Sequence, residues 1–261
     1  MSSVLLNNLE TASIGRDEEW PQDAKLFQPY DMEQILLPDN ANCLAVQTYL
    51  RMCKLPFTVQ HRSNAEFMSP SGRVPFLQCG LHLVTELDPI IAFVGNKGIS
   101  LTDHMDSRQK SDMRADMSLV NNVLISAELY LSWVEPLLLQ EVTQPRYGSV
   151  FPWPLNNILT YLKRRAVVSK LKALQWANKT PNEVYGEVDK ACRNLSARLG
   201  NNHFFFSRPT ELDALVFGHT YTILSTKLPD NRLADVLRGY PNLISHCDRI
   251  QSQFSTRKLS Q

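Results

Sequence analysis

Thiols and imidazoles are the side chains of this sequence best able to act as nucleophiles, bases or metal ligands. The five cysteines and six histidines are Cys43, Cys53, Cys79, Cys192, Cys247, His61, His82, His104, His203, His219 and His246. They form no Cys-x-x-Cys pair, zinc-like spacing or His-Glu-x-x-His motif, and no Gly-x-Ser-x-Gly or Walker sequence occurs. The sequence therefore predicts no metal site and no catalytic constellation. His219, which lies in an apolar helical pattern, is interpreted as structural.

A proline in an otherwise apolar strand pattern is the most unusual local feature. Residues 69–77 read Ser-Pro-Ser-Gly-Arg-Val-Pro-Phe-Leu, and Pro75 has no N–H to donate to a neighbouring strand. Such prolines occur at sheet edges, at bulges or in deliberate turns, of which a cis X-Pro bond is one. We expect Pro75 to make a structural turn that leads into a strand.

The elements around this proline alternate between strands and helices. Short strands are expected at 24–27, 57–59, 74–78 and 82–85, with at most a turn or two of helix within 64–68. A longer helix is expected to be capped by Asn40 or Asn42, and another by Asp88, which precedes Pro89 in the first turn. This order is typical of a small α/β sandwich, which we assign to residues 23–100.

Beyond Gly98 the strand pattern stops and helical periodicity replaces it. Apolar residues recur at intervals of three and four along 113–131, and further helices are expected at 155–177, 181–199, 210–226 and 231–253. Thr210 stands three residues before Asp213, a spacing close to a capping box, in which hydroxyl and carboxylate each satisfy a helix N–H. The sequence thus predicts an all-α domain at 105–254, and residues 1–22 are polar and unpatterned, as in a flexible arm.

Composition limits the classes of function. The chain has 261 residues with 27 basic and 26 acidic side chains, so its net charge of +1 favours no general binding to nucleic acid. The odd number of cysteines favours a reducing compartment. The acidic start of the chain is unlike a transit peptide, and the apolar runs fall far short of the ~20 residues that a spanning helix needs.

Two surface features are candidates for contacts with other molecules. Residues 145–154 hold three prolines among aromatic side chains, which predicts a loop. Its Tyr147, Phe151 and Trp153 are residue types enriched at interfaces, so the loop either contacts another molecule or folds back on its own domain. The basic side chains Lys163, Arg164 and Arg165 lie in a cationic helix. Their side of this helix either contacts lipid or a partner or is simply exposed to solvent. In this helix we assign Leu162, Val167, Val168, Leu171 and Leu174 to the core-facing stripe.

The motifs around Pro75, with Thr85-Glu86 after the next strand and the Thr210–Asp213 box, resemble the glutathione-transferase-like fold, a thioredoxin-like domain followed by an all-α domain. More narrowly, residues 33–56, 63–77, 146–156 and 209–224 are similar to the metaxin family. In the glutathione-transferase-like fold the proline is cis. The metaxin resemblance implies a subunit of the sorting and assembly machinery on the cytosolic face of the mitochondrial outer membrane. The implied partners are a metaxin-one-type protein and the β-barrel assembly subunit, which hold the chain at the membrane and through which it supports β-barrel insertion.

The resemblance also shows which catalytic groups are missing. A glutathione transferase needs a hydroxyl or thiol at the start of its first helix, where this chain has Leu37-Pro38-Asp39, and a carboxylate there repels a thiolate. The serine expected after Glu86 is replaced by Leu87, which offers no hydrogen bond to a γ-glutamyl carboxylate. The nearest thiol, Cys43, is placed inside the first turn and interpreted as a core filler. We therefore expect no cofactor and no catalysis.

Two alternatives remain at this point. An active glutathione transferase or thiol oxidoreductase is favoured by the fold and by Cys43 alone. A soluble adaptor for cytoskeletal or signalling partners is compatible with every feature of the sequence.

Overall fold

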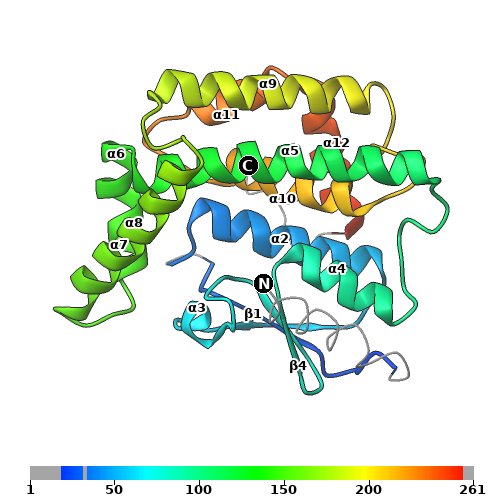
Figure 1. The fold of residues 1–261 in the computed structure, drawn as a ribbon, viewed down its shortest axis with the longest axis horizontal. Helices are drawn as coiled ribbons and strands as arrows, with labels where there is room; N and C mark the ends of the chain where they lie inside the picture. Colours follow the sequence, from blue (N-terminus) through cyan, green and yellow to red (C-terminus); the bar gives the residue numbers. More distant parts are fainter. Residues whose placement is uncertain (1–18, 32–33, 255–261) are drawn as a thin grey trace.

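The structure is a computed structural model that describes residues 19–31 and 34–254. Figure 1 shows its layers: a small sheet at one side, then α2 (Leu37–Met52) and α4 (Leu87–Asn96), and then α5 (Ser107–Trp133) and α10 (Glu211–Ser225), with α9 (Pro181–Leu199) outermost. This arrangement confirms the predicted fold class of a thioredoxin-like α/β unit joined to an all-α unit. The division of the chain at residues 101–104 stays a prediction.

The sheet has four strands in the order β2-β1-β3-β4. Its strands are β1 (Lys25–Gln28), β2 (Thr58–His61), β3 (Phe76–Cys79) and β4 (His82–Thr85). Strands β1 and β2 run parallel, whereas β3 pairs with both β1 and β4 in the antiparallel sense. Leu26 lies opposite Leu77 and both are fully buried, so the register places the apolar side chains of neighbouring strands together under α2.

Helix α10 crosses α2 at very short range and joins the two parts of the fold. Thirteen of its fifteen residues are buried. A Cβ added at Gly218 would lie 2.3 Å from the carbonyl oxygen of Ala41 and 3.0 Å from the Cβ of Ala45. Only a residue without a side chain permits this approach, so Gly218 sets the distance between the two helices.

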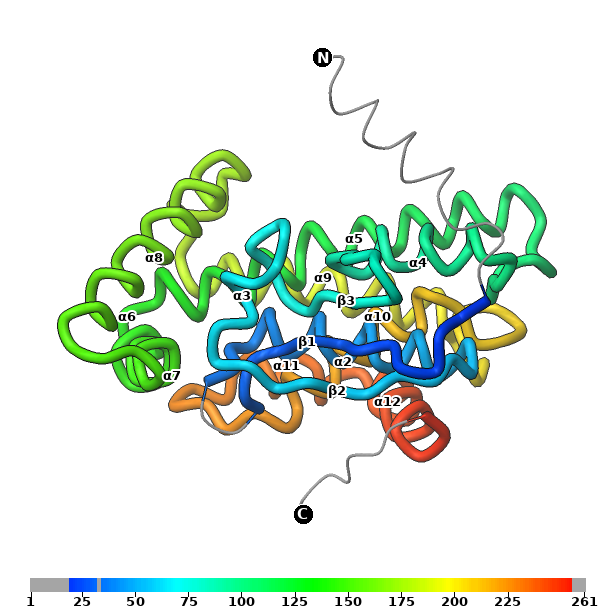
Figure 2. The backbone as a smooth tube through the Cα atoms, turned by 90° about the horizontal axis from the view of Figure 1, so that it is seen from below, coloured from blue at the N-terminus to red at the C-terminus, as the bar shows by residue number. Residues whose placement is uncertain are grey.

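The remaining elements surround these layers. Their bounds are α3 (Ala65–Met68), α6 (Pro136–Leu138), η1 (Leu139–Thr143), α7 (Gln144–Gly148), α8 (Leu155–Ala173), α11 (Arg232–Arg238) and α12 (Pro241–Phe254). In Figure 2, seen from below, α8 runs along the outer edge of the molecule with α6 and α7 beside it.

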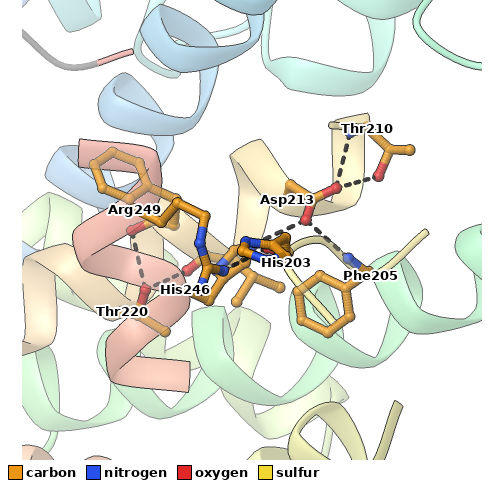
Figure 3. A network of polar contacts seen from close by, with 9 residues as sticks. His203, Phe205, Thr210, Asp213, Thr220, His246 and Arg249 are labelled. Atoms are coloured by element: carbon orange, nitrogen blue, oxygen red, sulfur yellow. Dashed lines mark hydrogen bonds and ion pairs between the residues drawn. The ribbon is translucent and has the colours of Figure 1, made fainter. Parts of the chain in front are cut away.

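A buried polar network fixes the start of α10 (Figure 3). The Asp213 carboxylate accepts hydrogen bonds from the Thr210 N–H and hydroxyl, at 2.8 and 2.7 Å, and from the Phe205 N–H at 3.0 Å. It also pairs with His246 Nε2 of α12 at 2.9 Å, with both side chains fully buried. The capping box read from the sequence therefore extends, through Asp213, to a neighbouring helix and to the preceding loop.

Several expected boundaries are wrong. The helix expected to be capped by Asn40 or Asn42 begins at Leu37, because Pro38 fits the first turn without needing an N–H partner. Helix α4 begins after Glu86, not at Asp88. The Nδ2 group of Asn40 instead donates to Thr222 Oγ1 of α10 at 3.2 Å.

Two expectations about the helical part also need correction. Residues 145–148 of the predicted loop are helical, because α7 continues directly from the wider π-helical turn η1, and Pro145, which has no N–H to donate, follows that turn. The single helix expected over 231–253 is two helices, because Pro241 starts a new helix after the turn at Gly239. Most of the predicted arm, residues 1–18, lies outside the described residues, and Trp20 Nε1 donates to the Pro56 carbonyl at 2.8 Å.

Candidate functional site

A cavity of about 470 Å³ lies between the α/β part and helices α5 and α8. It is bounded by the first turn of α2, by the turn before β3, by the start of α4 and by the facing sides of α5 and α8. Its charged lining groups are Asp39, Arg73, Glu86, Asp88, Lys163 and Lys170. Because the first α2 turn, the residue before Pro75 and the pair Glu86-Leu87 all line it, this is the place where a glutathione-like ligand would have to bind in this chain.

Asp39 occupies the turn that would have to stabilise a thiolate. Burial raises the pKa of its carboxyl to about 6, an effect that nearby Lys163 opposes and the carboxylate of Glu66 reinforces. At neutral pH the group is still mostly ionised and repels a second anion at the helix N-terminus. Cys43 is the seventh residue of α2, beyond the first turn in which we expected it, and its side chain is buried. The first-turn N–H groups are therefore not beside its sulfur.

The part of the cavity where a γ-glutamyl carboxylate would have to bind contains a salt bridge and a leucine. Arg73 Nη1 lies 2.6 Å from Glu86 Oε2, and both residues line the cavity. Glu86 itself has a left-handed backbone, with φ of 68°, and directly precedes Leu87 at the start of α4. The Leu87 side chain is buried and has no group that can donate a hydrogen bond. A ligand carboxylate at the N-terminus of α4 would therefore lack the serine hydroxyl that glutathione transferases are expected to have at this position.

Three charged or polar side chains from distant segments meet beside the cavity, and one of them, Lys163, lines it. Lys163 of α8 forms an ion pair with Glu66 of α3, and the Tyr147 hydroxyl donates to the other oxygen of Glu66 at 3.2 Å. Burial and the neighbouring Glu66 carboxylate raise the pKa of the Tyr147 phenol. Glu66 was not singled out in the sequence, where nothing indicated that residues 66, 147 and 163 come together.

The predicted structural residues lie away from the cavity's polar walls. The Val74–Pro75 bond is cis, and the Pro75 carbonyl accepts a hydrogen bond from the Glu86 N–H at 3.3 Å. Thr210 and Asp213 form the capping box of α10 (Figure 3). His219 is buried and pairs with Glu128 of α5 at 2.7 Å, which gives it a structural partner.

The three aromatic side chains of the 145–154 segment have different surroundings. Tyr147 is buried against Trp133, with ring centroids 5.4 Å apart. Phe151 is half-buried and meets Phe67 edge to face at 6.0 Å. Trp153 is 80% exposed, so it is the member of this group available to another molecule.

The cations of α8 are likewise divided. Lys163 is neutralised by Glu66, Arg164 Nε donates to the Trp133 carbonyl at 3.2 Å, and Arg165 is exposed. The expected core-facing stripe is partly wrong: Val167 and Leu171 are buried, whereas Leu162 and Leu174 are 53% and 45% exposed. Leu162 and Leu171 are nine residues apart, which places them on opposite sides of an α-helix.

The part of the chain that the structure describes has neither a single membrane-spanning helix nor a cluster of metal ligands. No single helix there is both long and apolar enough to cross a membrane, whereas α5 taken with residues 136–148 passes on length and composition but is bent by 64°. Nowhere in residues 19–31 and 34–254 do three or more His, Cys, Asp or Glu side chains gather as ligands for one metal ion.

The chain aligns with several named proteins over almost its whole length. Metaxin-2 of Mus musculus is 51% identical over 244 residues, which are 93% of each chain, and Metaxin-2 of Homo sapiens is 50% identical over the same share. The chain belongs to the metaxin family. A second branch of the metaxins is more distant: Metaxin-1 of Mus musculus is 32% identical over 222 residues, covering 82% of this chain and 70% of that protein.

Family models and solved structures give the setting of this membership and the fold that accompanies it. Residues 43–164 of this metaxin match a family described as outer mitochondrial membrane transport complex protein, and residues 188–250 match the C-terminal domain of glutathione S-transferases. The structure is similar to the beta-etherase LigF from Sphingobium, with a TM-score of 0.58, 14% identity and coverage of 89% and 96% of the two chains. A glutathione S-transferase of Ceriporiopsis subvermispora gives a TM-score of 0.57 at 9% identity, over 91% and 98%. The matches support a role connected with mitochondrial import for this metaxin.

Proposed function

We propose that this metaxin is a non-catalytic subunit of the mitochondrial outer-membrane sorting and assembly machinery. It docks on the cytosolic face with a metaxin-one-type partner and with the outer-membrane β-barrel assembly subunit, and it supports protein import and β-barrel insertion. The observation that carries the proposal is the 51% identity to Metaxin-2 across 93% of the chain, together with the family match over residues 43–164. It takes no nucleic acid, which agrees with its net charge of +1.

The chemistry of the cavity supports a docking role over catalysis. A transferase lowers the pKa of a thiol by placing a donor at the helix N-terminus, whereas Asp39 places a partly ionised carboxyl there. Leu87 removes the hydroxyl that would hold a ligand carboxylate, and Arg73 and Glu86 already neutralise each other. Cys43 is buried within α2. The chain therefore acts as a folded scaffold that binds its partners through its surface.

The proposal is tested by depleting the chain in its own cells. We expect the steady-state level of outer-membrane β-barrel proteins to fall, with recovery on re-expression, and the epitope-tagged chain to co-purify with a metaxin-one-type protein. Imported matrix proteins that need no barrel assembly serve as the internal control at early times. Normal barrel levels after depletion would contradict the proposal.

A second function, glutathione transfer or thiol oxidoreduction, is favoured by one observation, the cavity of about 470 Å³ at the place where such a ligand would sit. Titration of the purified chain with glutathione in a calorimeter, followed by a thiol-conjugation assay, separates the two functions. We expect neither binding heat nor turnover. Retention on glutathione-agarose with turnover that is lost in Cys43→Ala would establish the enzyme instead.

A further inference from the structure

Helix α8 exposes a row of large apolar side chains. Leu155, Ile158 and Leu162 are 42%, 50% and 53% exposed. They follow one another at three and four residues, which places them within an arc of about 60° on the helix. The opposite side of α8, with Val167 and Leu171, is buried in the protein. The helix is therefore held in place by one side and presents an apolar ridge on the other.

Two aromatic side chains border this ridge. Trp153 lies just before α8 and is 80% exposed, and Tyr161 lies within the helix and is 62% exposed. Figure 2 shows α8 along the outer edge of the molecule, away from the sheet and from α9. The ridge from Leu155 to Leu162 covers seven residue steps of about 1.5 Å, or about 10 Å of the helix axis.

The segment of the sequence that contains the ridge carries charge of one sign. Between Glu141 and Glu183 the sequence has no aspartate or glutamate. The same stretch holds seven basic residues, Arg146, Lys163, Arg164, Arg165, Lys170, Lys172 and Lys179. The segment thus carries +7 in a chain of net charge +1, which leaves −6 for all other residues.

Pairing within the protein removes only part of this charge. Lys163 is matched by Glu66 and Lys179 lies 3.5 Å from Glu187. Arg164 Nε donates to the Trp133 carbonyl, whereas Arg165 and Lys172 are exposed on the ridge side of α8. An anionic surface is the complement of this field.

We propose that the α8 ridge, Trp153, Leu155, Ile158, Tyr161 and Leu162 with Arg165 and Lys172 beside it, binds the surface of a membrane that contains anionic lipid. Leucine, isoleucine and tryptophan side chains on one face with lysine and arginine alongside are the pattern of a helix that lies in the headgroup layer without crossing the membrane. Tryptophan and tyrosine are enriched at that depth. Each cation near an anionic leaflet contributes about a fivefold increase in binding.

A membrane fits this surface better than a protein does. The centres of protein interfaces are depleted in charged residues, and lysine is depleted across the whole interface. Here the apolar side chains form a convex ridge with cations along it, and the family match that includes residues 153–164 is to proteins of the outer mitochondrial membrane. The inference does not depend on the proposed subunit role, because it requires only this chain and lipid.

Vesicle flotation of the purified full chain, without any partner, tests the inference. Vesicles of phosphatidylcholine are compared with vesicles in which about 30% of the lipid is phosphatidylserine. We expect flotation with the anionic vesicles, little with phosphatidylcholine alone, and a steep loss of binding as salt is raised. A chain that floats with neither kind of vesicle would overturn the inference.

Matched variants locate the contact. Arg165→Glu changes the charge by two and is expected to weaken binding about 25-fold, and Ile158→Ser with Leu162→Ser about tenfold or more. Arg114→Glu, at an exposed site on α5, and Leu81→Ser, at a fully exposed turn, are the controls, and both are expected to bind as wild type does.

Circular dichroism and thermal unfolding confirm that each variant is folded. Because the substituted side chains of α8 are at least half exposed or carry charge at the surface, the variants are expected to unfold near the wild-type temperature. Equal vesicle binding by the α8 variants and wild type would refute the assignment. If those variants instead lost a metaxin-one-type partner and kept vesicle binding, the ridge would be a protein interface and the inference would be wrong.

Discussion

The contact between α10 and α2 at Gly218 is very close, and an added methyl group tests it directly. A Cβ at position 218 would lie 2.3 Å from the Ala41 oxygen and 2.9 Å from the Ala45 nitrogen. Both are backbone atoms of a buried helix and cannot rotate away. Gly218→Ala therefore requires the two helices to separate by roughly 1 Å, and close-packed interiors resist such movement.

Two opposing effects set the size of the change. Alanine is more favourable than glycine in a helix interior by about 1 kcal/mol. Overpacking a well-packed core costs typically about 1 to 3 kcal/mol, and a clash with backbone atoms belongs at the upper end of that range because no side chain can adjust. The free energy of unfolding of Gly218→Ala is therefore expected to fall by about 2 kcal/mol, and its Tm by about 4 to 8 °C.

Urea unfolding followed by far-UV circular dichroism measures this loss as a lower midpoint with an unchanged slope. Gly186→Ala on α9 is the matched control, since a Cβ at position 186 meets nothing within 4 Å. That variant gains only the helix preference and is expected to be more stable by about 0.5 to 1 kcal/mol. If Gly218→Ala were as stable as the wild type, the packing argument would be refuted.

Two other predictions concern buried carboxyl groups. Asp213→Ala leaves His246 and two N–H groups without their acceptor and is expected to lose about 3 to 5 kcal/mol, against about 1 kcal/mol for Thr210→Ala, both measured by thermal unfolding. The pKa of Asp39 is raised from 3.8 to about 6 in the folded chain, so its contribution to stability is fully present below about pH 4 and is lost as pH rises through 6. The free energy of unfolding of Asp39→Asn is thus expected to exceed that of the wild type by up to about 3 kcal/mol at pH 7 and to match it at pH 4. The control variant Asp23→Asn, at an exposed position, is expected to match the wild type at both pH values. Equal dependence of stability on pH for Asp39→Asn and wild type would contradict this reasoning.

Local signals in the sequence were sufficient wherever an element depends on its own residues. Helix α9 has the predicted bounds of 181–199, because Thr180, Pro181 and Glu183 mark its start and Gly200 follows its end. The start of α2 was placed too late because Asn40 and Asn42 are good capping residues, whereas the helix begins three residues before Asn40 with Pro38 in its first turn. Helix α7 was missed because Pro145 and Gly148 resemble loop residues when their neighbours are unknown.

The candidate site depends on contacts between distant residues, which one sequence does not contain. Glu66 and Lys163 are 97 positions apart, and only the packing of α3 near α8 brings them together. The exposure of Leu162 was also missed, because periodicity shows which residues share a face but not which of two apolar faces meets the core. The absence of acidic residues between Glu141 and Glu183 can be seen in the sequence alone, and this segment contains α8.

Helix α8 therefore separates two environments. On its inner side Lys163 and Lys170 line the cavity, where the carboxyl groups of Asp39, Glu86 and Asp88 and the Glu66 partner of Lys163 oppose the positive charge, so little of it remains to attract an anionic ligand. On its outer side Arg165 and Lys172 are exposed beside the apolar ridge, and the basic surplus of residues 142–182 acts outward. A glutathione-binding protein requires the opposite distribution, with donors and cations directed into the cavity. The placement of charge on this one helix thus argues for function at the outer surface, independently of the missing thiol and hydroxyl.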